Sequence, residues 1–255
     1  MRFKLRFFFG VSAFFLIGCG SLGVYNAATG RHEFIFVPTD AEVAMGRDIH
    51  KKLINEFSLA KRKNQSDRLT KIGYRLAQIS DRQDYEYQFY LVEKDELNAF
   101  TTPGGNIYFF TGLMDKLKTD DQIAAVLAHE IGHCAARHTI KKFQAALGYN
   151  LLGNIVFSQL KMEEQAQQIA TLSTRVIMNL VFSSYSRKDE HEADWLGVKY
   201  LSLAGYRLDA MIEILEILKK ESKPDHVPLM LRTHPYLDDR IETVKKEIEK
   251  TRSEN

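Results

Sequence analysis

Helical periodicity dominates the chain and begins soon after residue 38. Apolar residues recur at roughly helical spacing over about 39–59, namely at Ala44, Ile49, Leu53 and Phe57. The start of this segment has the sequence of a capping box, with Thr39 at the N-cap and Glu42 at the third helical position. A second helix is expected over about 66–79.

Two short segments have the periodicity of strands. Aromatic and polar residues alternate over 85–91, and the segment 106–111 is aromatic and β-prone. The intervening stretch 98–105 is rich in turn residues, and beyond Gly112 the pattern is helical almost to the end, apart from a loop over 221–234. Strands followed by helices predict a predominantly helical α+β domain with a small antiparallel sheet.

The N-terminus has the features of an export signal. Three basic residues precede an apolar run over 7–18, which is too short for a comfortable membrane span. The run ends in Leu-Ile-Gly followed by Cys19, which resembles the bacterial lipobox, where the cysteine is lipidated after cleavage. The alternative is an ordinary signal peptide, or an anchor, that contains a cysteine.

This pattern divides the chain into a lipoprotein signal peptide (1–18), the lipidated Cys19 with a tether (19–37), and one domain (38–255). Gly20 follows the cysteine, a pattern that usually implies the outer membrane in bacteria with two membranes. We therefore expect an outer-membrane lipoprotein that faces the periplasm, attached to the membrane through its N-terminal lipid.

Composition excludes some classes of protein. The 255 residues are 45% hydrophobic, which is enough for one substantial core. Three of the 35 basic residues and none of the 33 acidic ones lie in the signal, so the remainder is almost neutral and has no basic block for nucleic acid. With Cys19 lipidated, Cys134 is the one remaining thiol, and no intrachain disulfide can form.

The stretch AVLAHEIGHCAARH carries the strongest chemical signal. His129 and His133 are four residues apart, so their side chains lie on nearly one face of a helix and can reach one ion. Glu130 points to the side, where it can contact a metal-bound water, as in the H-E-x-x-H signature of zinc hydrolases. On a continuous helix His138 would face away from the ion, so the third ligand lies elsewhere. Small residues such as Gly132 leave room for another element to approach.

Two further sites have more than one interpretation. Glu190 and Asp194 share a helix face, which fits either a metal ligand with its supporting carboxylate or a solvated acidic face. His234 could cap or pack at a helix start, stabilise an oxyanion, or occupy a fourth zinc position as a latch.

The segment 143–160 is apolar but interrupted, which favours a surface helix or lid over a membrane span, and the sequence leaves open whether 143–175 is mobile.

Four motifs in order resemble the zinc endopeptidase family of HtpX and the CaaX prenyl proteases. They are HEIGH, an E-x-x-A-D motif whose glutamate lies 57 residues after His133, the earlier stretch NAFTTPGGNIYFFTGLM, and a late T-H-P. Ser186-Arg187 also precedes Glu190 as it does in that family. The membrane-embedded members have transmembrane helices, and this chain departs from them there. It is similar to the soluble, periplasm-facing branch, which implies a zincin-like (gluzincin) peptidase fold.

The resemblance assigns roles to individual residues. It implies that His129, His133 and Glu190 bind one Zn²⁺ per chain and that Glu130 is the general base. Asp194 becomes the partner that accepts the second N–H of a ligating histidine. The strand residues Ile107, Tyr108, Phe109 and Phe110 become an edge strand that pairs with an extended substrate.

The function implied is that of a zinc-dependent metalloendopeptidase. A zinc-activated water would hydrolyse peptide bonds in unfolded or misassembled envelope proteins, with outer-membrane assembly machinery as a potential partner. The competing hypothesis is a zinc-binding chaperone or assembly factor, latched by His234, that rarely cuts. A purely structural zinc domain with four fixed protein ligands is a third, weaker alternative.

Overall fold

The computed structural model describes residues 24–35, 37–151 and 172–254. The predicted signal peptide, Cys19 and most of the predicted lid lie outside these residues. Within the described ranges, no helix combines the length and the apolar character that crossing a membrane requires.

Three strands form the central sheet, in the order β3 (Gln88–Val92), β5 (Asn106–Phe110), β4 (Ala99–Thr102). The β4–β5 pair is antiparallel, whereas β3 and β5 are parallel. The predominantly helical α+β class is confirmed, and the expected antiparallel pairing is present between β4 and β5 but not between β3 and β5. The stretch that the sequence suggested was a turn contains β4, which forms a hairpin with β5 and leaves β3 to pair with the opposite side of β5.

This strand order corrects the prediction that Ile107, Tyr108, Phe109 and Phe110 form a substrate-binding edge. They lie on β5, which is the central strand and is paired on both sides, so their backbone groups are already used by the sheet. The edges of the sheet are β3 and β4. Of these two strands, β4 is the one that packs against α4 (Asp120–Ala135).

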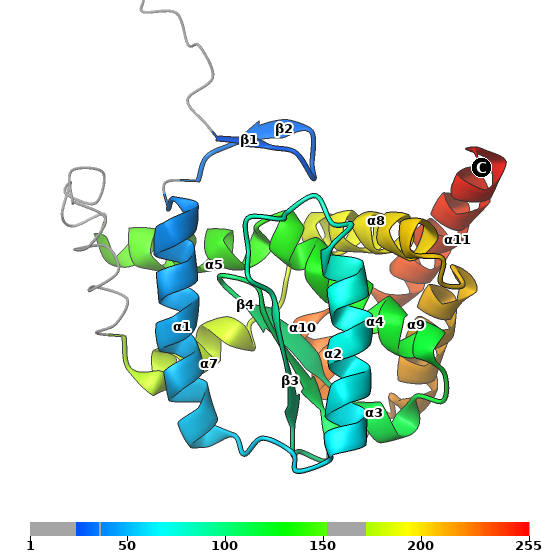
Figure 1. The fold of residues 1–255 in the computed structure, drawn as a ribbon, viewed down its shortest axis with the longest axis horizontal. Coiled ribbons are helices and arrows are strands. Elements are labelled where there is room, and N and C mark those ends of the chain that lie inside the picture. The colour runs from blue at the N-terminus through cyan, green and yellow to red at the C-terminus, as the bar shows by residue number, and fades with distance from the viewer. Residues whose placement is uncertain (1–23, 36, 152–171, 255) are drawn as a thin grey trace, which may run out of the picture.

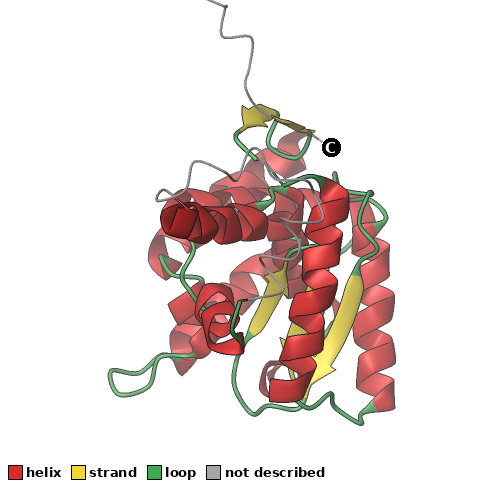
Figure 2. Ribbon diagram, turned by 90° about the vertical axis from the view of Figure 1, so that its left-hand side faces the viewer, coloured by secondary structure: helices red, strands yellow, loops and turns green. Residues whose placement is uncertain are grey.

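Both faces of the sheet are buried. Ile107 and Phe109 pack into a core formed with α2, α4, α8 and α9, whereas Tyr108 and Phe110 pack into a second core with α1, α5 and α7. Figure 2 shows helices on both sides of the strands. A strand that is apolar on both faces is expected in this position, because neither face contacts water.

The remaining helices surround the sheet (Figure 1). Their bounds are α1 Thr39–Glu56, α2 Lys63–Ala77, α3 Thr111–Lys116, α5 His138–Leu151, α7 Thr174–Val181, α8 Arg187–Ala204, α9 Asp209–Glu221, α10 Leu229–Thr233 and α11 Leu237–Glu254. The first two predicted helices correspond to α1 and α2. The predicted loop 221–234 contains the short helix α10.

The predicted capping box at the start of α1 is wrong. Pro38 is the N-cap, with no side-chain cap, and the Thr39 hydroxyl donates instead to Asp84 at 2.9 Å. The Glu42 carboxylate is buried and accepts a hydrogen bond of 2.7 Å from Arg137. A buried guanidinium is a stronger partner for a carboxylate than a backbone N–H, and this pair fixes α1 against the end of α4.

Part of the predicted tether is folded. Strands β1 (Val24–Asn26) and β2 (Arg31–Glu33) form an antiparallel hairpin at one end of the molecule (Figure 1). Arg31 pairs with Glu192 on α8, and Lys141 on α5 pairs with Glu33 at 2.8 Å. The hairpin is therefore joined to the two helices that flank the end of α4.

Helices α4 and α8 pack closely against each other. A Cβ added to Gly132 would lie 2.7 Å from the carbonyl oxygen of Ala193. Gly197 also lies close to the backbone of α4, since a Cβ there would lie 3.3 Å from the His129 backbone nitrogen. The predicted close approach at Gly132 is confirmed, and it brings the H-E-x-x-H helix next to the helix that carries Glu190.

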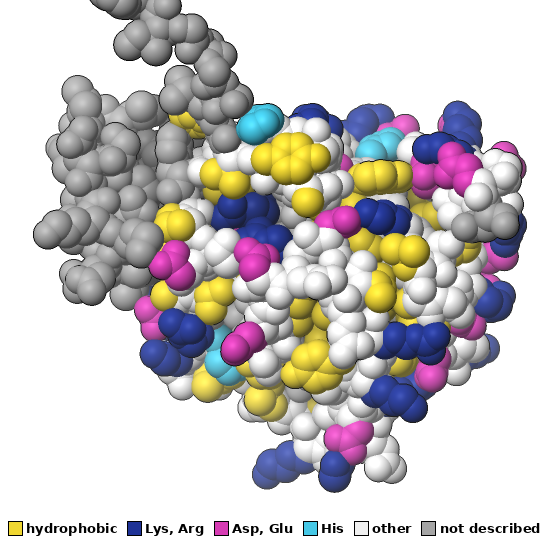
Figure 3. Space-filling model, turned by 45° about the horizontal axis from the view of Figure 1, so that its top comes forward, with side chains coloured by type: hydrophobic (Ala, Val, Ile, Leu, Met, Phe, Trp, Pro, Cys, Tyr) yellow, Lys and Arg dark blue, Asp and Glu magenta, His cyan; other side chains and the backbone are white. Residues whose placement is uncertain are grey.

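Charge is evenly distributed on the visible surface. On the face shown in Figure 3, basic and acidic side chains are interspersed and do not separate into large patches of one sign. This agrees with the nearly balanced composition of 35 basic and 33 acidic residues. A surface without a large basic patch is not that of a typical nucleic-acid-binding protein.

Candidate metal centre

Helix α4 presents its two motif histidines toward α8. The helix begins after Thr119, whose hydroxyl accepts a hydrogen bond of 3.2 Å from the Gln122 backbone N–H. His129 and His133 lie one turn apart, and their Nε2 atoms are 3.1 Å from each other. Both side chains are at least 98% buried. The shared helix face predicted from the sequence is thus present in the structure.

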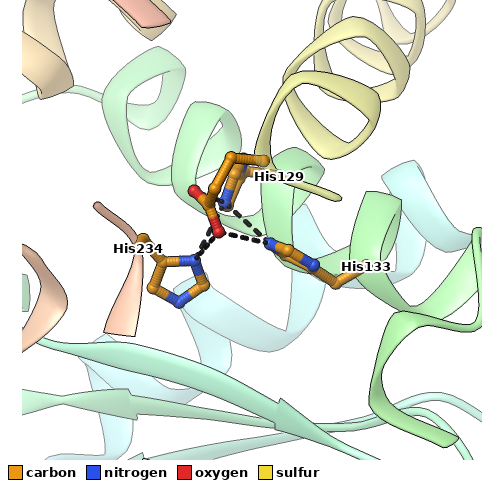
Figure 4. A group of neighbouring side chains, drawn as sticks. His129, His133 and His234 are labelled. Atoms are coloured by element: carbon orange, nitrogen blue, oxygen red, sulfur yellow. Dashed lines mark hydrogen bonds and ion pairs between the residues drawn. The ribbon is translucent and has the colours of Figure 1, made fainter. Parts of the chain in front are cut away.

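Two residues from other elements join these histidines. Glu190 comes from the first turn of α8, and His234 follows the short helix α10. One potential ligand atom from each of the four residues lies within 4.8 Å of the others. Figure 4 shows the three imidazole rings converging on a carboxylate group. His234 Nδ1 is 3.1 Å from Glu190 and 3.2 Å from His129 Nε2.

The spacing of these atoms fits a divalent metal. Two nitrogens bound to one tetrahedral zinc at about 2.0–2.1 Å lie about 3.3–3.4 Å apart, close to the distances between these imidazoles. Imidazole nitrogen and carboxylate oxygen are also ligands that zinc prefers. A cation placed between the three imidazole nitrogens would accept a lone pair from each of them. The residues present therefore fit a zinc ion.

Glu130 lies beside the four potential ligands without belonging to them. It is completely buried, and neither carboxylate oxygen has a hydrogen-bond partner in the part of the chain that the structure describes. Burial raises the pKa of Glu130, although the nearby His234 and His129 oppose the shift. One of its oxygens is 3.5 Å from His234 Nε2. A buried carboxylate of this kind can hold and transfer a proton.

Asp194 lies where the sequence placed it, behind His129. Its carboxylate is 2.8 Å from His129 Nδ1, one helical turn beyond Glu190. An imidazole whose Nδ1–H is held by a carboxylate presents an unprotonated Nε2 to the metal position. Burial opposes ionisation of Asp194, but Arg240 and His129 hold its pKa below the usual value.

Arg240 is a member of the site that the sequence analysis missed. Its guanidinium makes two hydrogen bonds of 2.7 Å to Asp194 and an ion pair of 2.7 Å to Glu190. Burial alone would raise the pKa of Glu190, but Arg240 and His234 outweigh that cost and hold the pKa well below its usual value. The sequence feature that could have identified Arg240 is its position on the apolar face of α11, between Leu237 and Val244.

His138 does not follow the helical extrapolation. Helix α4 ends at Ala135, and Arg137 has a positive φ of 57°, which a continuous helix does not allow. The chain therefore turns, and His138 begins α5 with its Nδ1 3.0 Å from His133 Nδ1. The expectation that His138 is outside the ligand group holds, but the expectation that it points away from the site is wrong.

Tyr185 and α10 cover the cluster. The Tyr185 ring stacks on His133 with 3.9 Å between ring centroids, and its backbone N–H donates to the carbonyl of Thr233 at 3.1 Å. Lys142 lies over the other side of this ring, with Nζ 3.7 Å from the centroid, and donates to Ser183 at 2.7 Å. A substrate could reach the buried cluster only if part of this cover moves.

Comparison with known proteins agrees with this arrangement. Residues 63–248 match the sequence model of Peptidase family M48. The mitochondrial metalloendopeptidase OMA1 of Schizosaccharomyces pombe is 26% identical over 224 residues, which are 86% of this chain and 65% of that protein. OMA1 of Arabidopsis thaliana is 32% identical over 159 residues, which are 62% of this chain and 31% of that protein.

A bacterial relative is also similar. The beta-barrel assembly-enhancing protease of Escherichia coli K12 is 29% identical over 180 residues, or 68% of this chain and 37% of that protein. The chain thus spans less than two thirds of the length of each of these three relatives. The resemblance inferred from the four sequence motifs is confirmed, and since the family match extends over most of the sequence, the chain belongs to Peptidase family M48, whose members are metallopeptidases.

Proposed function

We propose that this protein is a zinc-dependent metalloendopeptidase of the H-E-x-x-H, gluzincin type. His129, His133 and Glu190 would hold one Zn²⁺, and Glu130 would act as general base. The observation that carries the proposal is the convergence of these side chains, from α4 and α8, on one buried point beside a carboxylate that has no hydrogen-bond partner among the described residues. Membership of a metallopeptidase family supports the same assignment.

The side chains of the site divide the work of hydrolysis. When bound, zinc lowers the pKa of a water molecule to about 7 and polarises the peptide carbonyl. Glu130 takes the proton from the attacking water and delivers it to the leaving amine, and its burial favours holding that proton in between. Asp194 fixes the tautomer of His129, and Arg240 keeps Glu190 ionised.

His234 holds the site in a closed form in this proposal. Its Nδ1 lies among the other potential ligand atoms, so His234 would serve as a fourth ligand when a metal is bound. Catalytic zinc sites keep one position open for water or substrate, whereas four protein ligands close the site. Displacement of His234 and α10 would open the fourth position. A regulated peptidase therefore fits the geometry better than a constantly active one.

The four-ligand arrangement also favours a second candidate function. A chain that stays latched could bind unfolded proteins as a chaperone or assembly factor and rarely cut them. Retained cellular function in a Glu130→Gln variant would support this alternative over the peptidase.

We place the substrates among unfolded or misassembled envelope proteins. The lipobox-like sequence at Cys19 supports attachment to the outer membrane on its periplasmic side, and the name of one bacterial relative refers to beta-barrel assembly. The cellular test compares turnover of outer-membrane proteins under envelope stress in strains that carry wild type or Glu130→Gln. Equal turnover in the two strains would refute this role.

The direct test is cleavage of β-casein, an unfolded protein, by the purified, zinc-loaded full chain in detergent. We expect wild type to cut, and Glu130→Gln to cut about 100- to 10,000-fold more slowly, because general base catalysis contributes that much. The zinc content of both proteins should be one ion per chain. Glu130→Gln cleavage at the wild-type rate, with zinc bound in both, would reject the mechanism.

A further inference from the structure

The two nitrogens of His133 face different partners. Nε2 points to the other potential metal ligands, and Nδ1 lies 3.0 Å from Nδ1 of His138. On its far side, His138 Nε2 is 3.1 Å from the Glu192 carboxylate and 3.4 Å from Asp189. Four groups thus follow one another from the metal position outward: Nε2 of His133, its Nδ1, the His138 ring and the Glu192 carboxylate.

One arrangement of protons satisfies this chain when a metal is bound. Nε2 of His133 then offers its lone pair to the metal, so the proton of its neutral ring is on Nδ1. That N–H can donate only to an unprotonated Nδ1 of His138. A neutral His138 then has its proton on Nε2, where it donates to Glu192. Each contact thus fixes the tautomer of the next ring.

The outer end of this chain is fixed as well. Arg31 of the β1–β2 hairpin pairs with the second oxygen of Glu192. His138 itself is 1% exposed, so water does not compete for its nitrogens. Glu192 lies two residues after Glu190 on α8, and its side chain points to His138. The residue has a role there that differs from that of a metal ligand.

His129 provides an internal comparison. Its Nδ1 contacts the Asp194 carboxylate directly at 2.8 Å. Within the described residues no carboxylate lies that close to Nδ1 of His133, and His138 bridges the gap to Glu192. The two metal-facing histidines are thus oriented by carboxylates from the same helix, one directly and one through an intervening imidazole.

We propose that His138 and Glu192 are positioning residues that act as one relay to orient His133 for metal binding. This inference rests on the proposed zinc site and adds a requirement that the H-E-x-x-H motif does not contain. The turn at Arg137, with its positive φ, makes the relay possible because it directs His138 back toward α4. Partners of metal-binding histidines typically contribute 10- to 100-fold to metal affinity.

The test measures zinc release from the full chain after addition of excess chelator. His138→Gln and Glu192→Gln should each release zinc about 10- to 100-fold faster than wild type. The double variant should be no faster than the faster single variant, because removal of either residue already breaks the relay. His191→Gln is the matched control, since His191 lies on α8 and pairs with Asp239 at 2.7 Å instead.

Two further readouts separate positioning from a general loss of structure. The visible absorption of the Co²⁺-loaded protein should change in Glu192→Gln, because the geometry at His133 changes, while thermal unfolding of the metal-free forms stays within a few degrees of wild type. Glu192→Gln preserves side-chain size, so it tests the relay even if His138→Gln does not fold. The His191→Gln spectrum should match wild type.

Two results would overturn the relay. One is wild-type zinc release in Glu192→Gln, and the other is multiplication of the two single effects in the double variant, which would mean that the residues act separately. Neither result would affect the proposed function, which depends on zinc binding and casein cleavage by wild type. Conversely, if wild type and His234→Ala both bind zinc and neither cuts, the peptidase would be rejected and the relay left intact.

Discussion

Arg240 determines how much negative charge the metal centre can hold. One buried guanidinium contacts two buried carboxylates, Asp194 and Glu190, and a third carboxyl group, Glu130, lies nearby. Buried charges without partners are costly, so the metal-free site depends on this arginine. A divalent cation would share that role when it is bound.

Replacement of Arg240 by Leu should therefore destabilise the metal-free protein by about 3–5 kcal/mol, the usual cost of removing one partner of a buried ion pair. The loss should be smaller with zinc bound. Urea unfolding with and without zinc measures both values. Arg252→Leu is the control, because Arg252 lies on the same helix in an exposed pair with Asp209 and should change stability by less than about 1 kcal/mol. Equal, small effects at both positions would contradict this assignment.

Lys142, which lies against Tyr185 above the candidate metal centre, makes the stability of the protein depend on pH. Burial lowers the pKa of Lys142 to about 8, against an ordinary value of 10.5, although the carboxylates of Glu190, Glu130 and Asp189 oppose the shift. Between these two values the unfolded chain binds more protons than the folded one, so stability rises with pH across that window. Below pH 8 both states are protonated and the cost of burying the charge is fully present.

We expect the free energy of unfolding of wild type to rise by about 1–2 kcal/mol between pH 7 and 9.5 from this residue alone. Urea titrations at several pH values, beside Lys142→Met, measure it. At low pH the free energy of unfolding of Lys142→Met should exceed that of wild type, because the variant buries no charge. This advantage should shrink, or reverse in favour of wild type, as the pH rises. A difference that stays constant over this range would show that the lysine titrates normally.

At the scale of elements, the contact between α4 and α8 sets the distance between the motif histidines and Glu190. A Cβ at Gly132 would meet the Ala193 backbone, which cannot rotate away. Gly132→Ala should therefore separate the helices, cost about 1–3 kcal/mol of stability and weaken zinc binding. In an open helix position the same change would stabilise by about 1 kcal/mol, so the sign of the effect is diagnostic.

Gly73→Ala provides the control for this prediction. A Cβ at Gly73 in α2 would also clash, with the Phe89 ring at 2.5 Å, but it is not at the α4–α8 contact. Its zinc affinity should equal that of wild type, whatever stability it loses. Calorimetric titration with zinc measures the affinity of both variants. A loss of affinity in Gly132→Ala alone would show that overpacking acts at the α4–α8 contact rather than through a general loss of stability. Stabilisation of the protein by Gly132→Ala would contradict the account.

The sequence predicted elements well where local periodicity decides them and poorly where tertiary contacts do. The helix that carries His129 and His133 followed from residue spacing, because helical periodicity is a local pattern. Strand β4 has only four residues, all of them buried, and its sequence shows no alternation, so the local pattern predicts a turn there. The Thr39 cap failed because Arg137, almost 100 residues away, binds Glu42.

The same distinction explains the site. His129, His133 and Glu190 carry motif spacings, and the structure brings them together. His138 and Arg240 depend on the turn at Arg137 and on the packing of α11, neither of which has a local signature. A non-glycine residue with positive φ cannot be recognised from its identity, and a single arginine on an apolar helix face gives a weak signal without its partners.

At the scale of the whole molecule, the metal centre is enclosed. The four potential ligands and Glu130 are each at most 2% exposed. Figure 4 shows His234 completing the ring of side chains from an element separate from α4 and α8. A peptide in this position requires an open form, and the enclosed form would then be the resting state. Activity would depend on the population of the open form.

The most direct measurement compares initial rates of β-casein cleavage by zinc-loaded, full-length wild type, His234→Ala and the Glu130→Gln/His234→Ala double variant. We predict that His234→Ala cuts about 10- to 100-fold faster than wild type, as expected if the open form of wild type is populated at about 1–10%, and that the double variant does not cut. A His234→Ala variant that is slower than wild type, or a double variant as active as His234→Ala, would contradict a zinc peptidase that His234 holds closed.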